Sequence, residues 1–147
     1  MSSFRLTSLA FVEGGSIPAV HTCNGPDRSP PLVWTAAPAG TNAFALIVDD
    51  PDAGGWVHWV VVDLPATTAA LEADAARTMS ARQGKTSWGT AGWRGPCPPS
   101  GTHRYVFTLF ALDRQLGLSG SPSAADVKRA MAGHVLGQAV LSGRSSR

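Results

Sequence analysis

Cysteine, charge and long apolar runs are all scarce in this chain, and each scarcity excludes a class of protein. The 147 residues include only two cysteines, Cys23 and Cys97, which is too few for a disulfide scaffold and gives no CxxC pair. We expect two reduced thiols, although a contact between them stays open because both lie in Pro/Gly-rich segments. No apolar run approaches the roughly 20 residues of a membrane span, and 6–12 is too short and too mixed for a signal peptide. The expectation is a cytoplasmic protein with no transmembrane segment.

Charged residues make up only 15% of the chain, and the net charge is +2. The basic residues are scattered, so no Lys/Arg run is available to follow a phosphate backbone, and no nucleic-acid partner is expected. Apolar residues make up 44%, which is enough for a real core in a chain of this length. We expect one domain over 1–147.

Most of the predicted elements are strands, because short apolar runs alternate with Gly/Pro-rich turns. The predicted strands are 9–12, 32–34, 43–48, 56–64, 103–112 and a short last one at 140–141, after which 143–147 is expected to fray. One helix is predicted over 124–135, capped by the Ser-Pro-Ser segment that precedes it. The balance predicts a mainly β domain.

Strand periodicity also gives two histidines a direction. Side chains two residues apart share a face of a strand. This count places His58 on the face of Val60, Val62 and Leu64, and His103 on the face of Tyr105. The other two histidines, at positions 21 and 134, have no acidic or proline-rich neighbourhood and are expected to be structural or exposed.

Two polar clusters next to the apolar runs form the candidate site, since ionisable groups beside a core need a partner, a ligand or a chemical role. The first contains Asp50, Asp52 and His58, and the second contains Pro98, Pro99, His103 and Tyr105. Four interpretations of these residues stay open. They are an anion site, a metal site, general acid–base catalysis by a His–Asp pair, and a simple turn at Asp-Pro-Asp. The metal interpretation lacks any close-spaced signature such as HxH or HExxH, so no metal or other cofactor is expected.

At these residues the chain resembles the phosphatidylethanolamine-binding proteins, and in particular their bacterial branch described as Raf-kinase-inhibitor-like. The resemblance runs along the whole chain. It is carried by SPPLVW at 29–34, ALIVDDPD at 45–52, WVHWVV at 56–61, GPCPP at 95–99 and HRYVFTL at 103–109.

The resemblance implies a large central β-sheet packed on a smaller one, with one or two helices near the C-terminus. It also implies a small anion-accepting pocket at the surface, which binds phosphate-like groups including phospholipid headgroups. Its members in this sequence would be Asp50, Asp52, His58, Pro98, Pro99, His103 and Tyr105. Several members of the family regulate kinases or other proteins, which makes a protein partner a further expectation.

The sequence departs from the family pattern around the expected pocket. Only Ala53-Gly54-Gly55 separates Asp52 from the next strand, and the segment before His103 is also short. Shorter loops should open the mouth of the pocket. We therefore expect a binding protein for a small anionic or phosphate-bearing ligand. The alternative is an enzyme that uses Asp50, His58 and His103 for acid–base chemistry in a cyclisation, isomerisation or addition.

Overall fold

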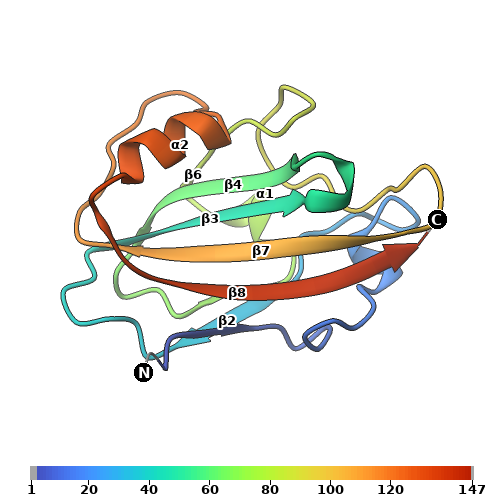
Figure 1. The fold of residues 1–147 in the computed structure, drawn as a ribbon, viewed down its shortest axis with the longest axis horizontal. Coiled ribbons are helices and arrows are strands. Elements are labelled where there is room, and N and C mark those ends of the chain that lie inside the picture. Colours follow the sequence, from blue (N-terminus) through green and yellow to red (C-terminus); the bar gives the residue numbers. More distant parts are fainter. Residues whose placement is uncertain (1–2, 147) are drawn as a thin grey trace.

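Five antiparallel strands form the larger of two sheets in the computed structural model, which describes residues 3–146. The strand order is β6-β4-β3-β7-β8, so that β3 is the central strand and β4 and β7 flank it (Figure 1). The strands are β3 (Ala43–Asp50), β4 (Trp56–Pro65), β6 (Arg82–Gln83), β7 (Thr102–Leu112) and β8 (Val135–Ser146). The predictions at 43–48, 56–64 and 103–112 are confirmed. The first two are apolar runs that suit strands buried on both faces, whereas buried and half-buried positions alternate along β7.

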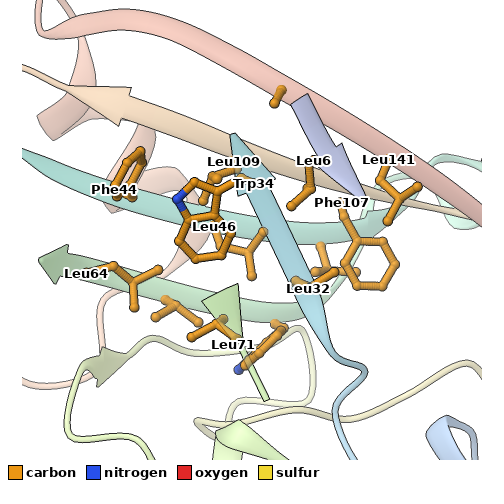
Figure 2. Packing of buried hydrophobic residues seen from close by; sticks show 14 of the residues in the cluster. Leu6, Leu32, Trp34, Phe44, Leu46, Leu64, Leu71, Phe107, Leu109 and Leu141 are labelled. Carbon is orange, nitrogen blue, oxygen red and sulfur yellow. The ribbon is translucent and has the colours of Figure 1, made fainter. Parts of the chain in front are cut away.

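A smaller sheet covers one face of the larger one. It has the order β1-β2-β5 and consists of β1 (Arg5–Thr7), β2 (Leu32–Thr35) and β5 (Ala70–Leu71). The main core lies between the two sheets, where Trp34 of β2 packs over Phe44 and Leu46 of β3 (Figure 2). Each fully buried aliphatic or aromatic side chain there contributes about 1.5–3 kcal/mol. The predicted run at 9–12 is not a strand, since Leu9 is 89% exposed and the first strand lies at β1.

The opposite face of the larger sheet is covered by α2 (Ala124–Met131), whose Val127 packs near Val60 and Val62 of β4. The Ser123 side chain accepts from the Asp126 N–H and the Asp126 carboxylate accepts from the Ser123 N–H, which completes a capping box. The helix is shorter than the predicted 124–135. It ends where Gly133 adopts a positive φ of 83° and β8 begins.

Three short helical turns complete the fold. They are η1 (Ala19–His21), η2 (Pro51–Ala53) and α1 (Ala75–Thr78). Of these, η2 matters most for the site, because it follows directly on β3 and turns the chain back toward β4.

The last strand is much longer than the sequence predicted. In place of a two-residue strand with a frayed end, β8 pairs with β7 from Val135 to Ser146. Residues 13–17 then lie along the outer edge of β8, where Gly14 N–H donates to the Ser142 carbonyl at 2.8 Å and Ile17 N–H donates to the Arg144 carbonyl at 2.8 Å. Backbone pairing on both sides therefore orders a segment whose side chains gave little strand signal.

Strand β4 is irregular at two places, and this changes the direction of His58. Opposite β3, Val48 pairs with Trp59 but Asp49 pairs with Val57, so that His58 is an extra residue in the register. A second shift, near Asp63 with a φ of 54°, turns Leu64 toward the main core. Val60 and Val62 do share a face, but the prediction that His58 and Leu64 lie on it as well is wrong, because each bulge inverts the period-two count.

Candidate functional site

Asp50 is the buried anchor of the site. It is the last residue of β3 and the N-cap of η2, and only 2% of it is exposed. One carboxylate oxygen, Oδ2, lies 2.6 Å from His103 Nδ1, and the other, Oδ1, accepts from the Asp52 N–H at 2.9 Å. Since a carboxylate only accepts, His103 Nδ1 carries a proton and Nε2 is the nitrogen left for a ligand.

Asp52 has a different position from the one expected. Its Oδ2 accepts from the Arg104 N–H of β7 at 2.8 Å, which fastens η2 to that strand. Asp52 does not line the cavity described below. Its predicted role in ligand binding stays a prediction, and its observed contact supports the position of Asp50.

His58 is held by a backbone carbonyl. Its Nδ1 lies 2.5 Å from the Arg94 oxygen, and the Arg94 N–H donates back to the His58 carbonyl at 3.1 Å. Burial lowers the pKa of His58, while the Arg94 carbonyl, Asp50 and Asp27 act in the opposite direction. The imidazole is therefore neutral near pH 7.

Tyr105 lies between the two histidines. Its ring centroid is 5.1 Å from that of His58, in an edge-to-face arrangement, and 6.4 Å from that of His103, in a stacked one. The predicted shared face of His103 and Tyr105 is thus observed. Burial raises the pKa of the Tyr105 hydroxyl, as do Asp50 and Asp52, so that the phenol stays protonated.

A cavity of about 180 Å³ opens in front of these groups. The structure brings six of the seven predicted residues to its wall, namely Asp50, His58, Pro98, Pro99, His103 and Tyr105. The other lining residues, which sequence reasoning missed, are Ala53, Trp56, Trp88 and Cys97.

The two tryptophans make an aromatic side of the cavity. Trp88 packs edge-to-face on Trp56 at 5.5 Å and on His58 at 5.1 Å. The Arg94 guanidinium lies 4.6 Å from the Trp88 ring centroid, which adds a cation next to the cavity wall. The sequence signal that could have indicated this aromatic side is Trp56, because a large aromatic residue shortly after the Asp-Pro-Asp turn is unusual in a simple loop.

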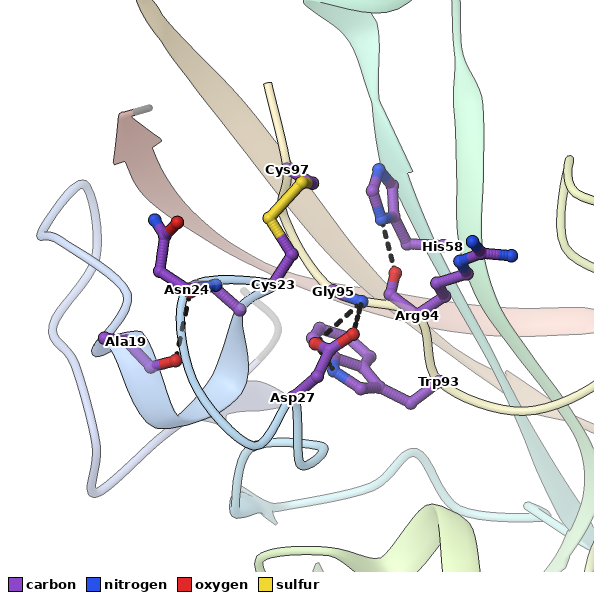
Figure 3. Close-up of a disulfide and its surroundings, with 10 residues drawn as sticks. Ala19, Cys23, Asn24, Asp27, His58, Trp93, Arg94, Gly95 and Cys97 are labelled. Carbon is purple, nitrogen blue, oxygen red and sulfur yellow. Dashed lines mark hydrogen bonds between the residues drawn. A yellow bond between two sulfur atoms is a disulfide. The ribbon is translucent and has the colours of Figure 1, made fainter. Parts of the chain in front are cut away.

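The two cysteines form a disulfide, so the prediction of two reduced thiols is wrong (Figure 3). The bond joins residues 74 positions apart, a proximity that sequence spacing alone does not reveal. It links the loop after η1 to Cys97 in the cavity wall, and Cys23 N–H also donates to the Pro96 carbonyl at 3.1 Å.

The loop after η1 also fixes the segment that carries Arg94, the hydrogen-bond partner of His58. The Asp27 carboxylate accepts from the Gly95 N–H at 3.0 Å and from the Trp93 indole at 3.2 Å, beside the disulfide (Figure 3). A Cβ at Gly95 would lie 2.3 Å from the His21 carbonyl, so this close approach requires glycine. The Arg94 carbonyl that orients His58 is therefore fixed by its neighbours.

Comparison with known proteins identifies the family of this chain. The profile of the family described as "Phosphatidylethanolamine-binding protein" matches residues 7–146. The chain belongs to the phosphatidylethanolamine-binding protein family. The predicted fold is confirmed as well, since two solved structures of this family superpose on nearly the whole chain.

The relatives give no specific function. The chain is 48% identical to a UPF0098 protein of Methanothermobacter thermautotrophicus, covering 95% of this chain and 96% of that protein. It is 39% identical to a Mycobacterium tuberculosis protein that carries a lipoprotein name, LppC, covering 94% of this chain and 70% of that protein.

The solved structures agree closely with the fold. A phosphatidylethanolamine-binding protein homolog from Chlamydia trachomatis has a TM-score of 0.95 at 34% identity, covering 100% of this chain and 99% of the other. YbcL of Escherichia coli, described as a member of the mammalian family, has a TM-score of 0.91 at 33% identity and covers 99% of both chains.

Within residues 3–146, no group of three or more His, Cys, Asp or Glu side chains is arranged to hold a metal ion. Over the same residues, no helix is long and apolar enough to cross a membrane.

Proposed function

We propose that this family member binds a small anion, such as phosphate or a phosphate-bearing group, in the cavity between His58 and His103. The observation that carries the proposal is the Asp50–His103 pair. A carboxylate that is almost fully buried holds one ring nitrogen at 2.6 Å, and the other ring nitrogen belongs to a residue that lines the cavity.

The remaining wall supports anion binding. When an anion meets His103 Nε2, the ring must present an N–H there, and Asp50 is placed to balance the charge of a doubly protonated imidazole. Tyr105 contributes a hydroxyl that stays protonated, and Pro98 and Pro99 contribute an apolar side that excludes water. Low local dielectric strengthens each of these hydrogen bonds.

Cavity size favours binding over the enzymatic alternative. Sites for drug-sized ligands usually enclose about 300–1,000 Å³, whereas this cavity encloses about 180 Å³. A phosphate-sized group fits such a space, while a biosynthetic substrate of ordinary size would have to remain largely outside it. Acid–base catalysis by Asp50, His58 and His103 therefore stays the second hypothesis.

Isothermal titration with inorganic phosphate and acetate tests the proposal. His103→Phe keeps a ring at this position but removes the donor, and we expect it to weaken phosphate binding by about tenfold or more. The matched control is His134→Phe, because His134 also pairs with a carboxylate, Asp113 at 2.9 Å, but does not line the cavity. No heat with either anion, or equal affinities for the His103 variant and the native protein, would contradict the proposal.

The cellular location also remains a proposal. The cytoplasmic prediction is not supported by the Cys23–Cys97 disulfide, since disulfides persist mainly in oxidising compartments. Fractionation of the host cells, followed by detection of the protein in each fraction, decides between the cytoplasm and an oxidising compartment.

A further inference from the structure

We propose that anion binding in this pocket is coupled to the redox state of the Cys23–Cys97 disulfide, so that the oxidised protein binds phosphate more tightly than the reduced protein. This inference rests on the proposed anion-binding function and adds a way in which binding is regulated. It follows from the position of the disulfide, which joins an exposed loop to the wall of the cavity.

The disulfide reinforces hydrogen bonds between the loop after η1 and the cavity wall. Cys97 is half-buried and lines the cavity, whereas Cys23 is exposed in the loop (Figure 3). The Cys23 N–H also donates to the Pro96 carbonyl at 3.1 Å, and the Asp27 carboxylate accepts from the Gly95 N–H at 3.0 Å. The loop therefore determines where this part of the wall lies.

On its cavity side, the same wall contacts two of the groups proposed to surround the anion. The Arg94 carbonyl lies 2.5 Å from His58 Nδ1, and the Cys97 backbone hydrogen-bonds to the Tyr105 hydroxyl. Pro98 follows Cys97 directly and contributes to the apolar side of the cavity. A displacement of the wall therefore changes the surroundings of His58 and Tyr105 as well as the shape of the cavity.

The opposite side of the cavity is held independently of the disulfide. His103 lies in β7 and pairs with Asp50 at the end of β3. Asp52 fastens η2 to β7 through the Arg104 N–H at 2.8 Å. Reduction should therefore alter one wall and leave the Asp50–His103 pair in place, which predicts a lower affinity in a folded protein.

Reduction lowers the affinity through a loss of preorganisation. When the S–S bond is broken, non-covalent contacts alone hold the wall, which then samples arrangements that do not bind. The apparent affinity falls in proportion to the fraction of molecules in the binding arrangement. By thermodynamic linkage, a bound anion must then favour the oxidised form over the reduced form by the same factor.

The redox step requires an external dithiol. Because Cys23 is exposed, a small dithiol has access to this end of the bond. A thiolate of the dithiol attacks the Cys23 sulfur, the S–S bond breaks, and Cys97 leaves as a thiolate that takes up a proton. The second thiol of the reductant then displaces the Cys23 sulfur, which also takes up a proton. The protein gains two electrons and two protons, and the dithiol becomes a disulfide.

Isothermal titration with inorganic phosphate measures the coupling in the oxidised and in the dithiol-reduced protein. We expect the reduced protein, with both thiols shown to be free, to bind at least about tenfold more weakly. Equal affinities of the two forms would overturn this inference and leave the proposed anion binding intact. Absence of phosphate binding by the oxidised protein would overturn both.

A double variant separates the effect of the bond from that of the reductant. Cys23→Ser/Cys97→Ser should bind phosphate as weakly as the reduced native protein, and its affinity should not change when the dithiol is added. Native affinity in this variant would contradict the inference.

The redox equilibrium measures the same coupling from the opposite direction. At phosphate concentrations that saturate both forms, the midpoint potential of the disulfide should become more negative, by about 30 mV for a tenfold difference in affinity. An unchanged potential would show that the two equilibria are independent.

A variant that keeps the disulfide decides the point if the reduced protein unfolds. Asp27→Asn weakens the clamp on Gly95, and asparagine tolerates the φ of 57° at this position. Removal of a negative charge by itself favours an anion, whereas displacement of the wall opposes it. We expect phosphate to bind about threefold or more weakly.

Asp74→Asn is the matched control for Asp27→Asn. It removes an equal charge from the exposed ion pair with Arg77 and should keep the native affinity. Native or higher affinity in the Asp27 variant would contradict the role given to the loop.

Discussion

At the scale of single residues, two buried tryptophans of the main core differ in whether their indole N–H has a hydrogen-bond acceptor. Trp59 is fully buried and donates to the Gln83 side chain at 2.8 Å. Trp34 is 3% exposed, and its Nε1 finds no hydrogen-bond partner within residues 3–146. A buried donor without a partner costs about 1–3 kcal/mol.

The two positions should therefore respond differently to the same substitution. In Trp34→Phe, removal of the unpaired donor offsets part of the lost packing. In Trp59→Phe, packing is lost and the Gln83 oxygen also loses its donor. We expect Trp59→Phe to lower the free energy of unfolding by about 1–2 kcal/mol more than Trp34→Phe, as measured by urea denaturation. A larger loss in the Trp34 variant would show that its indole N–H has a partner in solution.

Single residues also show how far the sequence could lead to the site. His103 and Tyr105 are positioned by a regular stretch of β7, so period-two counting predicts their common direction. His58 lies at a shift in the β3–β4 register, which no local pattern announces. Trp88 is positioned by a long loop, and its contact with His58 depends on the tertiary structure rather than on spacing.

At the scale of elements, β8 shows why an edge strand is hard to recognise. Central strands β3 and β4 are buried on both faces and appear as continuous apolar runs. In β8, buried positions alternate with exposed ones from Ala139 onward, and several of the buried residues are small. The sequence itself does not show this alternation, because Val140 is apolar but exposed while the buried Gly143 and Ser145 are not apolar, and glycine and serine also lower the strand propensity.

One of those small residues is predicted to be essential for the edge of the sheet. A Cβ at Gly143 would lie 2.7 Å from both Ile17 Cγ1 and Phe11 Cε2. We expect Gly143→Ala to lower the free energy of unfolding by about 1–3 kcal/mol through overpacking, as measured by chemical denaturation. The control Gln138→Ala changes an exposed side chain of the same strand and should stay within about 0.5 kcal/mol of the native value. If the Gly143→Ala variant were as stable as the native protein, residues 11–17 would have to move aside without an energetic penalty.

At the scale of the whole molecule, the disulfide is the only covalent link between distant segments of residues 3–146, and it closes a loop of 74 positions. In the chain-entropy account, a loop of this length stabilises the folded state by up to about 4 kcal/mol. The same loop contains β3 and β4 and carries most of the cavity wall.

Reduction should therefore be visible in thermal unfolding. We expect a dithiol reductant to lower the melting temperature of the native protein by several degrees, because the unfolded chain regains the freedom of the open loop. The double variant Cys23→Ala/Cys97→Ala should melt at a lower temperature whether or not reductant is present. Unchanged melting of the native protein in reductant, with both thiols shown to be free, would contradict this expectation.

The pairing of β7 with β8 has a practical consequence for anyone who handles the protein. His103 pairs with Ser145 and Thr102 pairs with Ser146, so the last described residues lie next to the cavity, at the end of the molecule opposite to the N-terminal label (Figure 1). A purification tag or surface linker attached after Ser146 would begin beside the mouth of the cavity and compete for the space in front of it. Attachment before Ser3 keeps the mouth of the cavity clear, and immobilised binding assays should be oriented accordingly.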